Sequence, residues 1–169
     1  MKNIVLILVL LQFLNIKINA QNSSGSIFDY IKNSKVPSFD ILINDSVHFS
    51  NNDLPVGKPI VIIYFSTECN HCKAKAKLLN ERIDSVRDAF FLWASYSPLD
   101  SIRKFSEKFG LDKFTNVRIG RDEHYFFPSY YKTTITPYIV IYNRKGRFSR
   151  EFRYGAKFHD IIEAINNDL

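Results

Sequence analysis

The sequence predicts an α/β fold, in which helices flank a central mixed β-sheet that carries an N-terminal β-hairpin extension. Short apolar segments of strand length alternate with segments of helical periodicity through the middle of the chain. Residues 138–154 then have the pattern of a β-hairpin, and an amphipathic segment closes the chain. Strands that alternate with helices in this way are typical of a sheet covered by helices.

The N-terminal segment has the features of a secretory signal peptide. Lys2 precedes an almost unbroken apolar stretch over residues 4–13, and Ala20 is a small residue at a plausible cleavage point. Only residues 3–16 lie between Lys2 and Lys17, which is fewer than the about 20 residues that a membrane helix needs. Export is therefore the favoured interpretation, and an uncleaved membrane anchor is the alternative.

These features predict how the chain is divided. We expect a signal peptide over residues 1–20, a flexible polar lead-in over 21–35 and one folded domain over 36–169. The full chain has 23 basic and 17 acidic residues, and loss of residues 1–20, with two lysines and no acid, would leave a net charge of +4. Because these charges are scattered along the chain, we expect a solvated surface and no nucleic-acid partner. We also expect a monomer.

Each element of the N-terminal half has its own pattern. Residues 37–49 predict a β-hairpin, because apolar and polar residues alternate up to a turn at residues 44–45. The continuous apolar run over residues 60–65 predicts a buried strand. The helix after it has apolar positions spaced by three or four residues, namely Cys72, Ala76, Leu79, Ile83 and Val86. Three of its lysines are expected to face mostly solvent: Lys73, Lys75 and Lys77.

The C-terminal half continues the alternation. Residues 89–94 predict a second buried strand, with Trp93 in the core, and Pro98 opens a helix that Gly110 ends. The remaining elements are a short strand (116–119), an aromatic segment with a short helix (124–132), a hairpin (138–142 and 148–154) and a closing helix with Phe158, Ile161, Ile162 and Ile165. The aromatic residues of 124–132 either line a groove or pack in the core: Tyr125, Phe126, Phe127, Tyr130 and Tyr131.

The two cysteines of the chain, Cys69 and Cys72, form a C-x-x-C sequence between a predicted strand and a predicted helix. At the start of a helix, free backbone N–H groups and the helix dipole stabilise a thiolate, which is the attacking species in disulfide exchange. A structural bridge is one alternative, but so short a loop constrains the unfolded chain little. Zinc is another, and it would need further ligands from residues without a paired spacing, namely His48, His71, His124 and His159.

The order of these elements resembles that of the thioredoxin superfamily, and within it the exported TlpA/ResA-like branch. The resemblance covers residues 36–166 and rests on the N-terminal hairpin, on C-x-x-C after the first central strand and on Thr136-Pro137 before the last hairpin. Shorter matching motifs are Gly57-Lys58-Pro59, Phe109-Gly110-Leu111 and Lys145-Gly146. The resemblance implies a thioredoxin fold for this part of the chain.

The resemblance also implies residue roles. Cys69 would be the exposed nucleophile and Cys72 the resolving thiol. Pro137 would be a cis-proline facing the disulfide, and Thr136 with Pro137 would pair with a substrate segment in the manner of an added strand. An ordinary trans proline that opens a strand is the alternative for Pro137.

Three positions depart from the thioredoxin pattern. Glu68 stands where thioredoxins usually have tryptophan, Asn70-His71 replaces Gly-Pro, and Ile63 replaces a buried acid that shuttles protons. A protonated His71 would favour the Cys69 thiolate and make the pair more oxidising, as in the DsbA-type C-x-H-C site, although this chain has no room for that family's helical insertion. Alternatively, His71 is a solvated bystander. Glu68 either accepts protons or is a surface acid near a helix start.

Taken together, the residues and the resemblance predict an enzyme, a thiol–disulfide oxidoreductase exported to the bacterial periplasm or cell envelope. Its partners would be protein thiols or disulfides, with cytochrome c maturation as one setting, and a membrane redox partner that recharges it; no cofactor and no metal are expected. A non-catalytic module that binds clients is one alternative. A thiol peroxidase is another, but the proline and threonine of the peroxiredoxin motif are replaced by Ile62 and Ser66.

Overall fold

The computed structural model describes residues 34–167, and the centre of its sheet is strand β3 (Ile60–Tyr64). All five residues of β3 are buried, as its uninterrupted apolar sequence predicts. It pairs in parallel with β4 (Phe90–Ser95) and antiparallel with β6 (Tyr138–Tyr142). Strand β5 (Val117–Arg121) pairs in parallel with β4, so the sheet is mixed.

The edges of the sheet are antiparallel. Strand β7 (Phe148–Phe152) pairs with β6 at one edge, and the hairpin of β1 (Asp40–Asn44) and β2 (Val47–Ser50) extends the other through β5. Within residues 34–167 the order is therefore β2-β1-β5-β4-β3-β6-β7. Gly120 allows β1 to approach β5, because a Cβ there would lie 2.8 Å from the carbonyl oxygen of Leu42.

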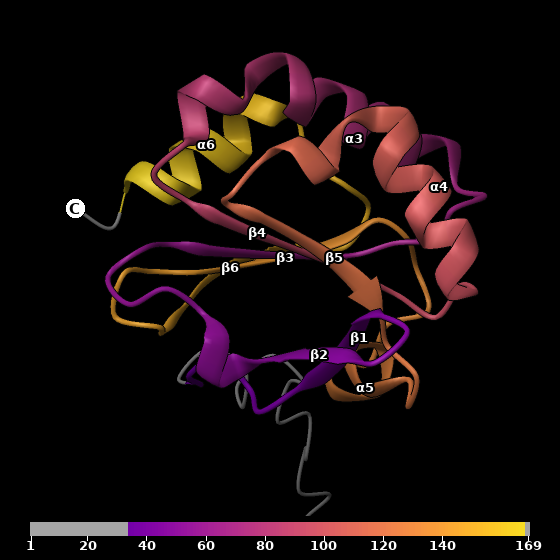
Figure 1. The fold of residues 1–169 in the computed structure, drawn as a ribbon. Helices are drawn as coiled ribbons and strands as arrows, with labels where there is room; N and C mark the ends of the chain where they lie inside the picture. The colour runs from indigo at the N-terminus through magenta and orange to yellow at the C-terminus, as the bar shows by residue number, and fades with distance from the viewer. Residues whose placement is uncertain (1–33, 168–169) are drawn as a thin grey trace, which may run out of the picture.

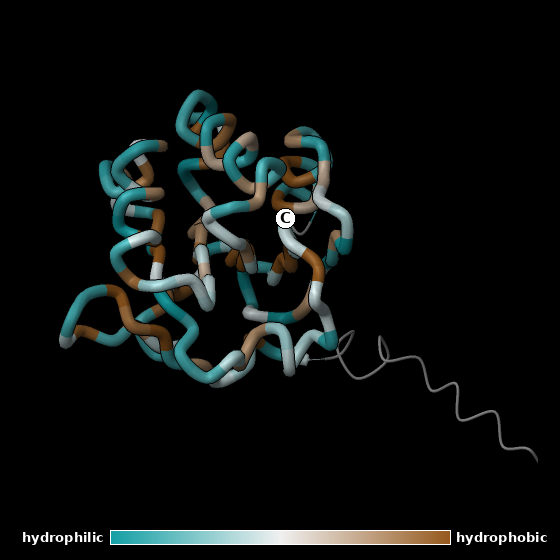
Figure 2. Tube along the Cα trace, turned by 90° about the vertical axis from the view of Figure 1, so that its right-hand side faces the viewer, coloured by the Kyte–Doolittle hydropathy of each residue, from teal (hydrophilic) through white to brown (hydrophobic). Residues whose placement is uncertain are grey.

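Helices cover one face of the sheet, and the N-terminal hairpin covers much of the other (Figure 1). The helices on the first face are α3 (Asn70–Arg82), α4 (Leu99–Phe109) and α6 (Phe158–Asn166). The short helix α5 (Phe126–Tyr130) lies with the hairpin on the second face. In Figure 2 the helices are hydrophilic along their outer sides and hydrophobic toward the middle of the molecule, as amphipathic helices that cover a sheet must be.

The helix boundaries follow from local sequence. Helix α3 begins two residues before its first apolar position and continues into the 3-10 turn η3 (Ile83–Val86). Helix α4 begins after Pro98 and ends at Gly110, whose φ of 66° lies in the left-handed region that glycine adopts without strain. Two further 3-10 turns, η2 (Asn51–Asp53) and η4 (Leu111–Lys113), lie in connections.

The aromatic segment around α5 belongs mainly to the core. Phe127 and Tyr131 are fully buried, and the Tyr131 hydroxyl lies 2.8 Å from that of Tyr142. The carboxylate of buried Asp122 accepts the backbone N–H groups of the first two residues of α5, each at 2.9 Å. Tyr125 is the exception, because it is 53% exposed. Trp93 is fully buried, as predicted.

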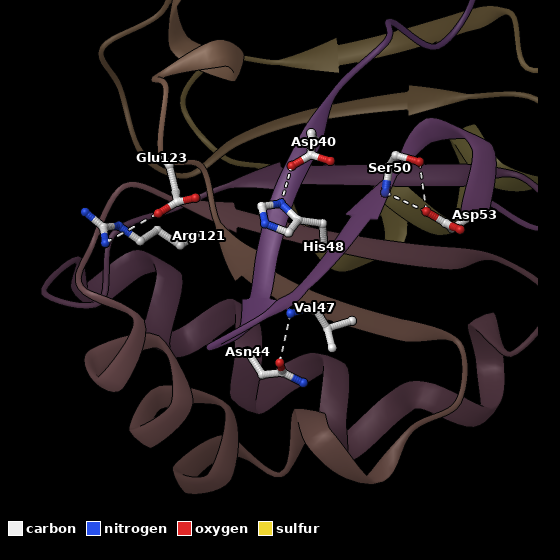
Figure 3. Close-up of polar contacts among 8 residues, drawn as sticks. All are labelled: Asp40, Asn44, Val47, His48, Ser50, Asp53, Arg121 and Glu123. Atoms are coloured by element: carbon white, nitrogen blue, oxygen red, sulfur yellow. Dashed lines mark hydrogen bonds and ion pairs between the residues drawn. The ribbon is translucent and has the colours of Figure 1, made fainter.

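Polar contacts hold the solvent side of the N-terminal hairpin (Figure 3). His48 on β2 lies 2.5 Å from the Asp40 carboxylate across the strand pair. The Asn44 side chain accepts the N–H of Val47 at 3.0 Å and closes the turn. Strands β1 and β2 pair antiparallel on either side of this turn, as the alternating sequence predicts.

The signal peptide expected over residues 1–20 and most of the lead-in expected over 21–35 lie outside the described residues. Among residues 34–167, no helix has the length and apolar character needed to cross a membrane.

Candidate functional site

The topology brings several loops together at one end of the strands of the sheet. Strands β3, β4 and β5 are parallel, so their carboxyl ends meet there, and the antiparallel partner β6 begins at the same end. Tyr64, the last residue of β3, pairs with Tyr138, the first residue of β6. The loop that leads to Cys69 therefore lies beside Thr136 and Pro137, although 67 residues separate Cys69 from Thr136 in the sequence.

Cys69 is the N-cap of α3, and its sulfur occupies the place of a capping oxygen. The Sγ atom accepts the backbone N–H of Cys72 at 3.2 Å. The Cys69 thiol in turn donates to the carbonyl oxygen of Thr136 at 3.4 Å. Cys69 is partly exposed, so a partner molecule can reach its sulfur, whereas the backbone around it is fixed by the helix start.

Cys72 has the opposite environment. Its side chain is fully buried in the core cluster between the helices and the sheet, together with Ala76 and Leu79. Burial raises the pKa of the Cys72 thiol to about 12, and the neighbouring Cys69 sulfur adds to this rise. Cys72 is therefore protonated when Cys69 reacts.

The pKa of Cys69 is shifted in the other direction. Partial burial opposes ionisation of its thiol, but hydrogen bonds with the thiol and backbone of Cys72, with the Thr136 side chain and with the backbone of His71 outweigh that effect. The pKa of the Cys69 thiol consequently lies below its ordinary value. Two chemically identical side chains three residues apart thus differ in exposure and in acidity, with the exposed one the more nucleophilic near neutral pH.

Pro137 follows a cis peptide bond from Thr136, as the resemblance implied. It lines a hollow of about 310 Å³ beside the start of α3, together with His71, Lys75 and the loop of residues 154–157. We call this space the cis-proline hollow. Gly155 approaches it closely: a Cβ on Gly155 would lie 3.6 Å from the Pro137 ring, and its φ of 80° suits glycine.

The two residues expected to tune the site are both exposed. His71 is exposed, and its imidazole lines the cis-proline hollow. The Glu68 side chain is 90% exposed and its carboxylate lies 4.0 Å from the Lys73 ammonium. Glu68 therefore faces solvent and Lys73 at the helix start rather than the buried Cys72.

Ile63, which stands where thioredoxins have a proton-shuttling acid, also has apolar surroundings in the structure. Ile63 is 3% exposed and packs in the same core cluster as Cys72. Buried hydroxyls follow β3 and β4 at this end of the sheet: Thr67 donates to Ser97 at 3.3 Å, and Ser95 donates to Ser97 at 3.0 Å. Among residues 34–167, no three His, Cys, Asp or Glu side chains are grouped as metal ligands would be.

Sequence reasoning missed Lys75 and the loop of residues 154–157. Lys75 was expected to face solvent, but it is half-buried, and its ammonium donates to the carbonyl oxygen of Ala156. Burial lowers the pKa of Lys75, and Asp160 partly offsets this effect. The predicted hairpin could have located this loop. In an antiparallel hairpin the second strand ends beside the start of the first, so residues 154–157 must lie near Pro137.

Comparison with known proteins supports the fold. No protein-family model and no curated protein sequence matches the chain. Solved structures do match it, among them a secreted disulfide oxidoreductase from Mycobacterium tuberculosis, with a TM-score of 0.64, 17% identity and coverage of 76% of this chain and 95% of that one. A peroxiredoxin-like protein from Aquifex aeolicus matches with a TM-score of 0.67, 14% identity and coverage of 81% and 86%.

A thioredoxin-like protein from Aeropyrum pernix matches as well, with a TM-score of 0.64, 14% identity and coverage of 77% and 89%. At such low identities these similarities concern the fold. The chain therefore has a thioredoxin-like fold, as its sequence predicts.

The contrast between the two cysteines predicts selective labelling. With limiting iodoacetamide, the reduced protein should be alkylated at Cys69 first, and the rate should rise at a lower pH than that of an ordinary thiol, because the pKa of Cys69 is lowered. Cys72 should stay unlabelled until the protein is unfolded, because its thiol is buried and its pKa is about 12. Peptide mapping by mass spectrometry measures both. Faster labelling of Cys72 would reverse the two roles.

Proposed function

We propose that this protein is a thiol–disulfide oxidoreductase that exchanges a Cys69–Cys72 disulfide with protein substrates. The observation that carries the proposal is the Cys69 sulfur at the N-cap of α3, partly exposed and beside Thr136 and Pro137, with Cys72 buried behind it. A structural staple would need neither the lowered pKa of Cys69 nor the partial exposure of this residue.

The geometry suits a two-step exchange. The Cys69 thiolate attacks a substrate disulfide, which forms a mixed disulfide and releases one substrate thiol. Cys72 then loses its proton and attacks the Cys69 sulfur, so the second substrate thiol leaves and the enzyme is oxidised by two electrons. The same steps in reverse oxidise a dithiol. In the last step of the reverse direction, the second substrate thiol attacks the substrate sulfur of the mixed disulfide and Cys69 leaves as a stabilised thiolate.

We further propose that Thr136 and Pro137 bind the substrate segment, with the cis-proline hollow receiving side chains next to its reacting cysteine. The hollow lies beside Pro137 and is open to solvent, and Gly155 adds no side chain to its lining. Exposed Tyr154 supplies apolar surface at its rim. An extended substrate segment in this position would pair with the backbone before Pro137 in the manner of an added strand.

The location is also part of the proposal. The apolar stretch over residues 4–13 supports export to a bacterial periplasm or cell envelope, where disulfides persist. There a membrane redox partner would recharge the enzyme. The N-terminal hairpin and the Thr136-Pro137 motif support a place in the TlpA/ResA-like branch.

Trapping a mixed disulfide tests the exchange chemistry. Cys72→Ser should react with a disulfide-bonded protein such as insulin and stop as a covalent adduct, because the resolving thiol is missing. Cys69→Ser should form no adduct, since the remaining thiol is buried and has a raised pKa. The wild type should reduce insulin with dithiothreitol as electron donor. Non-reducing electrophoresis and an insulin turbidity assay measure these outcomes. Binding of insulin without adduct or reduction would favour the client-binding alternative.

The tuning role proposed for His71 predicts a change in potential. An imidazolium near Cys69 stabilises the thiolate and hence the reduced pair, so His71→Ser should make the pair more reducing. A shift of about 30 mV, which for two electrons is about 1.4 kcal/mol, is the least that a real tuning role would produce. Equilibration with glutathione gives the potentials, and His159→Ser, a change of an exposed histidine on α6, is the matched control. Equal potentials for all three proteins would make His71 a bystander.

Export predicts removal of the N-terminal segment. Intact-mass measurement on protein from the cell envelope should show loss of about the first 20 residues. Recovery of the full-length chain in the membrane fraction would instead support the uncleaved anchor.

A further inference from the structure

Two hollows border the start of α3, one on each side. The first is the cis-proline hollow, which Lys75 and Lys157 help to line. The second, of about 250 Å³, lies between α3 and α4, and we call it the α3–α4 hollow; its rim carries Lys73, Lys104 and Lys108. Among the described residues that line the two hollows there are five lysines and a single acid, Glu68, whereas the whole chain has 23 basic and 17 acidic residues.

The α3–α4 hollow is lined by residues that flank the two cysteines in the sequence, Glu68 and Lys73. Lys73 follows Cys72, and its ammonium donates to the carbonyl oxygen of Glu68, the residue before Cys69, at 3.5 Å. Lys104 and Lys108 lie one turn apart on α4, and both are exposed. Phe105 and Phe109 add apolar surface to its lining, and the Lys108 ammonium lies 5.8 Å from the centroid of the Phe109 ring.

We propose that the disulfide substrate is a polypeptide with acidic residues around its reacting disulfide, and that its carboxylates bind the lysines of the two hollows. The inference rests on the proposed function. A single exposed ammonium–carboxylate pair contributes little to affinity. Several lysines around a reactive sulfur nevertheless raise the association rate of an anionic partner and lower that of a basic one.

The arrangement favours a polypeptide over a small anion. His71 and Lys75 line one hollow and Lys73 lines the other, so the two hollows lie on opposite sides of α3. A helix with its side chains is about 10 Å wide, so a ligand that contacts both hollows must span about that distance. An extended chain rises about 3.3 Å per residue, so a segment of a few residues centred on the reacting cysteine reaches both.

The test is a single-turnover reaction of the pre-reduced protein with synthetic peptides of equal length, each closed by one disulfide. The residues that flank the peptide cysteines are glutamate, glutamine or lysine. In every case the enzyme thiols are oxidised to the Cys69–Cys72 disulfide and the peptide disulfide is reduced to two thiols, so no other reductant is needed. Hydroxyethyl disulfide, which is small and uncharged, measures the intrinsic reactivity of Cys69. Oxidised glutathione is the small anionic probe.

At low salt, the glutamate peptide should react about tenfold faster than the glutamine peptide, and the lysine peptide more slowly than either. In about 1 M salt, where charges are screened beyond about 3 Å, the three rates should converge. In Lys104→Glu/Lys108→Glu, the preference for glutamate should fall to within about twofold or reverse. Lys104→Gln/Lys108→Gln should reduce it by less, which guards against misfolding of the charge-reversed variant.

The matched control is Lys113→Glu/Lys145→Glu, which makes the same change of net charge at exposed positions that line neither hollow. It should keep the preference for the glutamate peptide. Equal rates for all peptides, or an equal loss of the glutamate preference in the control variant, would overturn the inference. The proposed function would still stand if the protein reduces hydroxyethyl disulfide. If oxidised glutathione reacts as fast as the glutamate peptide, and this rate also depends on the lysines, the lysines would serve a small anionic disulfide instead of a polypeptide. Failure to reduce any disulfide would refute the proposed function itself.

Discussion

The burial of β3 is the constraint on which the rest of the site depends. A strand that is hydrogen-bonded on both sides and covered on both faces has one position in the sheet, so the chain leaves it at one fixed point. The loop to Cys69 begins at that point, and the antiparallel β6 brings Thr136 and Pro137 to it from a distant part of the sequence. Sheet topology thus brings Cys69 beside Thr136 and Pro137, and the start of α3 fixes the position of the sulfur.

The same architecture separates the properties of the two cysteines. Cys69 is outside the first turn of α3, where it accepts hydrogen bonds, whereas Cys72 is one turn inside and faces the core. Exposure, acidity and access to a partner therefore differ because the two thiols lie at different positions relative to the helix start. The lysines on either side of this helix start add a longer-range field, which acts on what approaches rather than on which sulfur reacts.

The sequence was sufficient to predict the strands, the main helices and the C-x-x-C junction, because buried strands and amphipathic helices have strong periodic patterns. It could not decide whether the aromatic residues near α5 line a groove. Phe127 and Tyr131 are core and Tyr125 is exposed, and this division depends on how α5 lies against the sheet. Lys75 was placed wrongly because its partner, the carbonyl of Ala156, comes from the far end of the chain. Local patterns carry no information about such tertiary contacts.

The capping role of the Cys69 sulfur couples the stability of the fold to its oxidation state. A thiolate is a stronger hydrogen-bond acceptor than the neutral sulfur of a disulfide, so the N–H groups at the start of α3 are better satisfied when the pair is reduced. Folding and oxidation form a closed thermodynamic cycle. Whatever free energy the helix start gives to the thiolate must therefore appear equally in the unfolding equilibrium of the reduced protein, so that melting curves of the two redox forms report the electrochemistry of the pair.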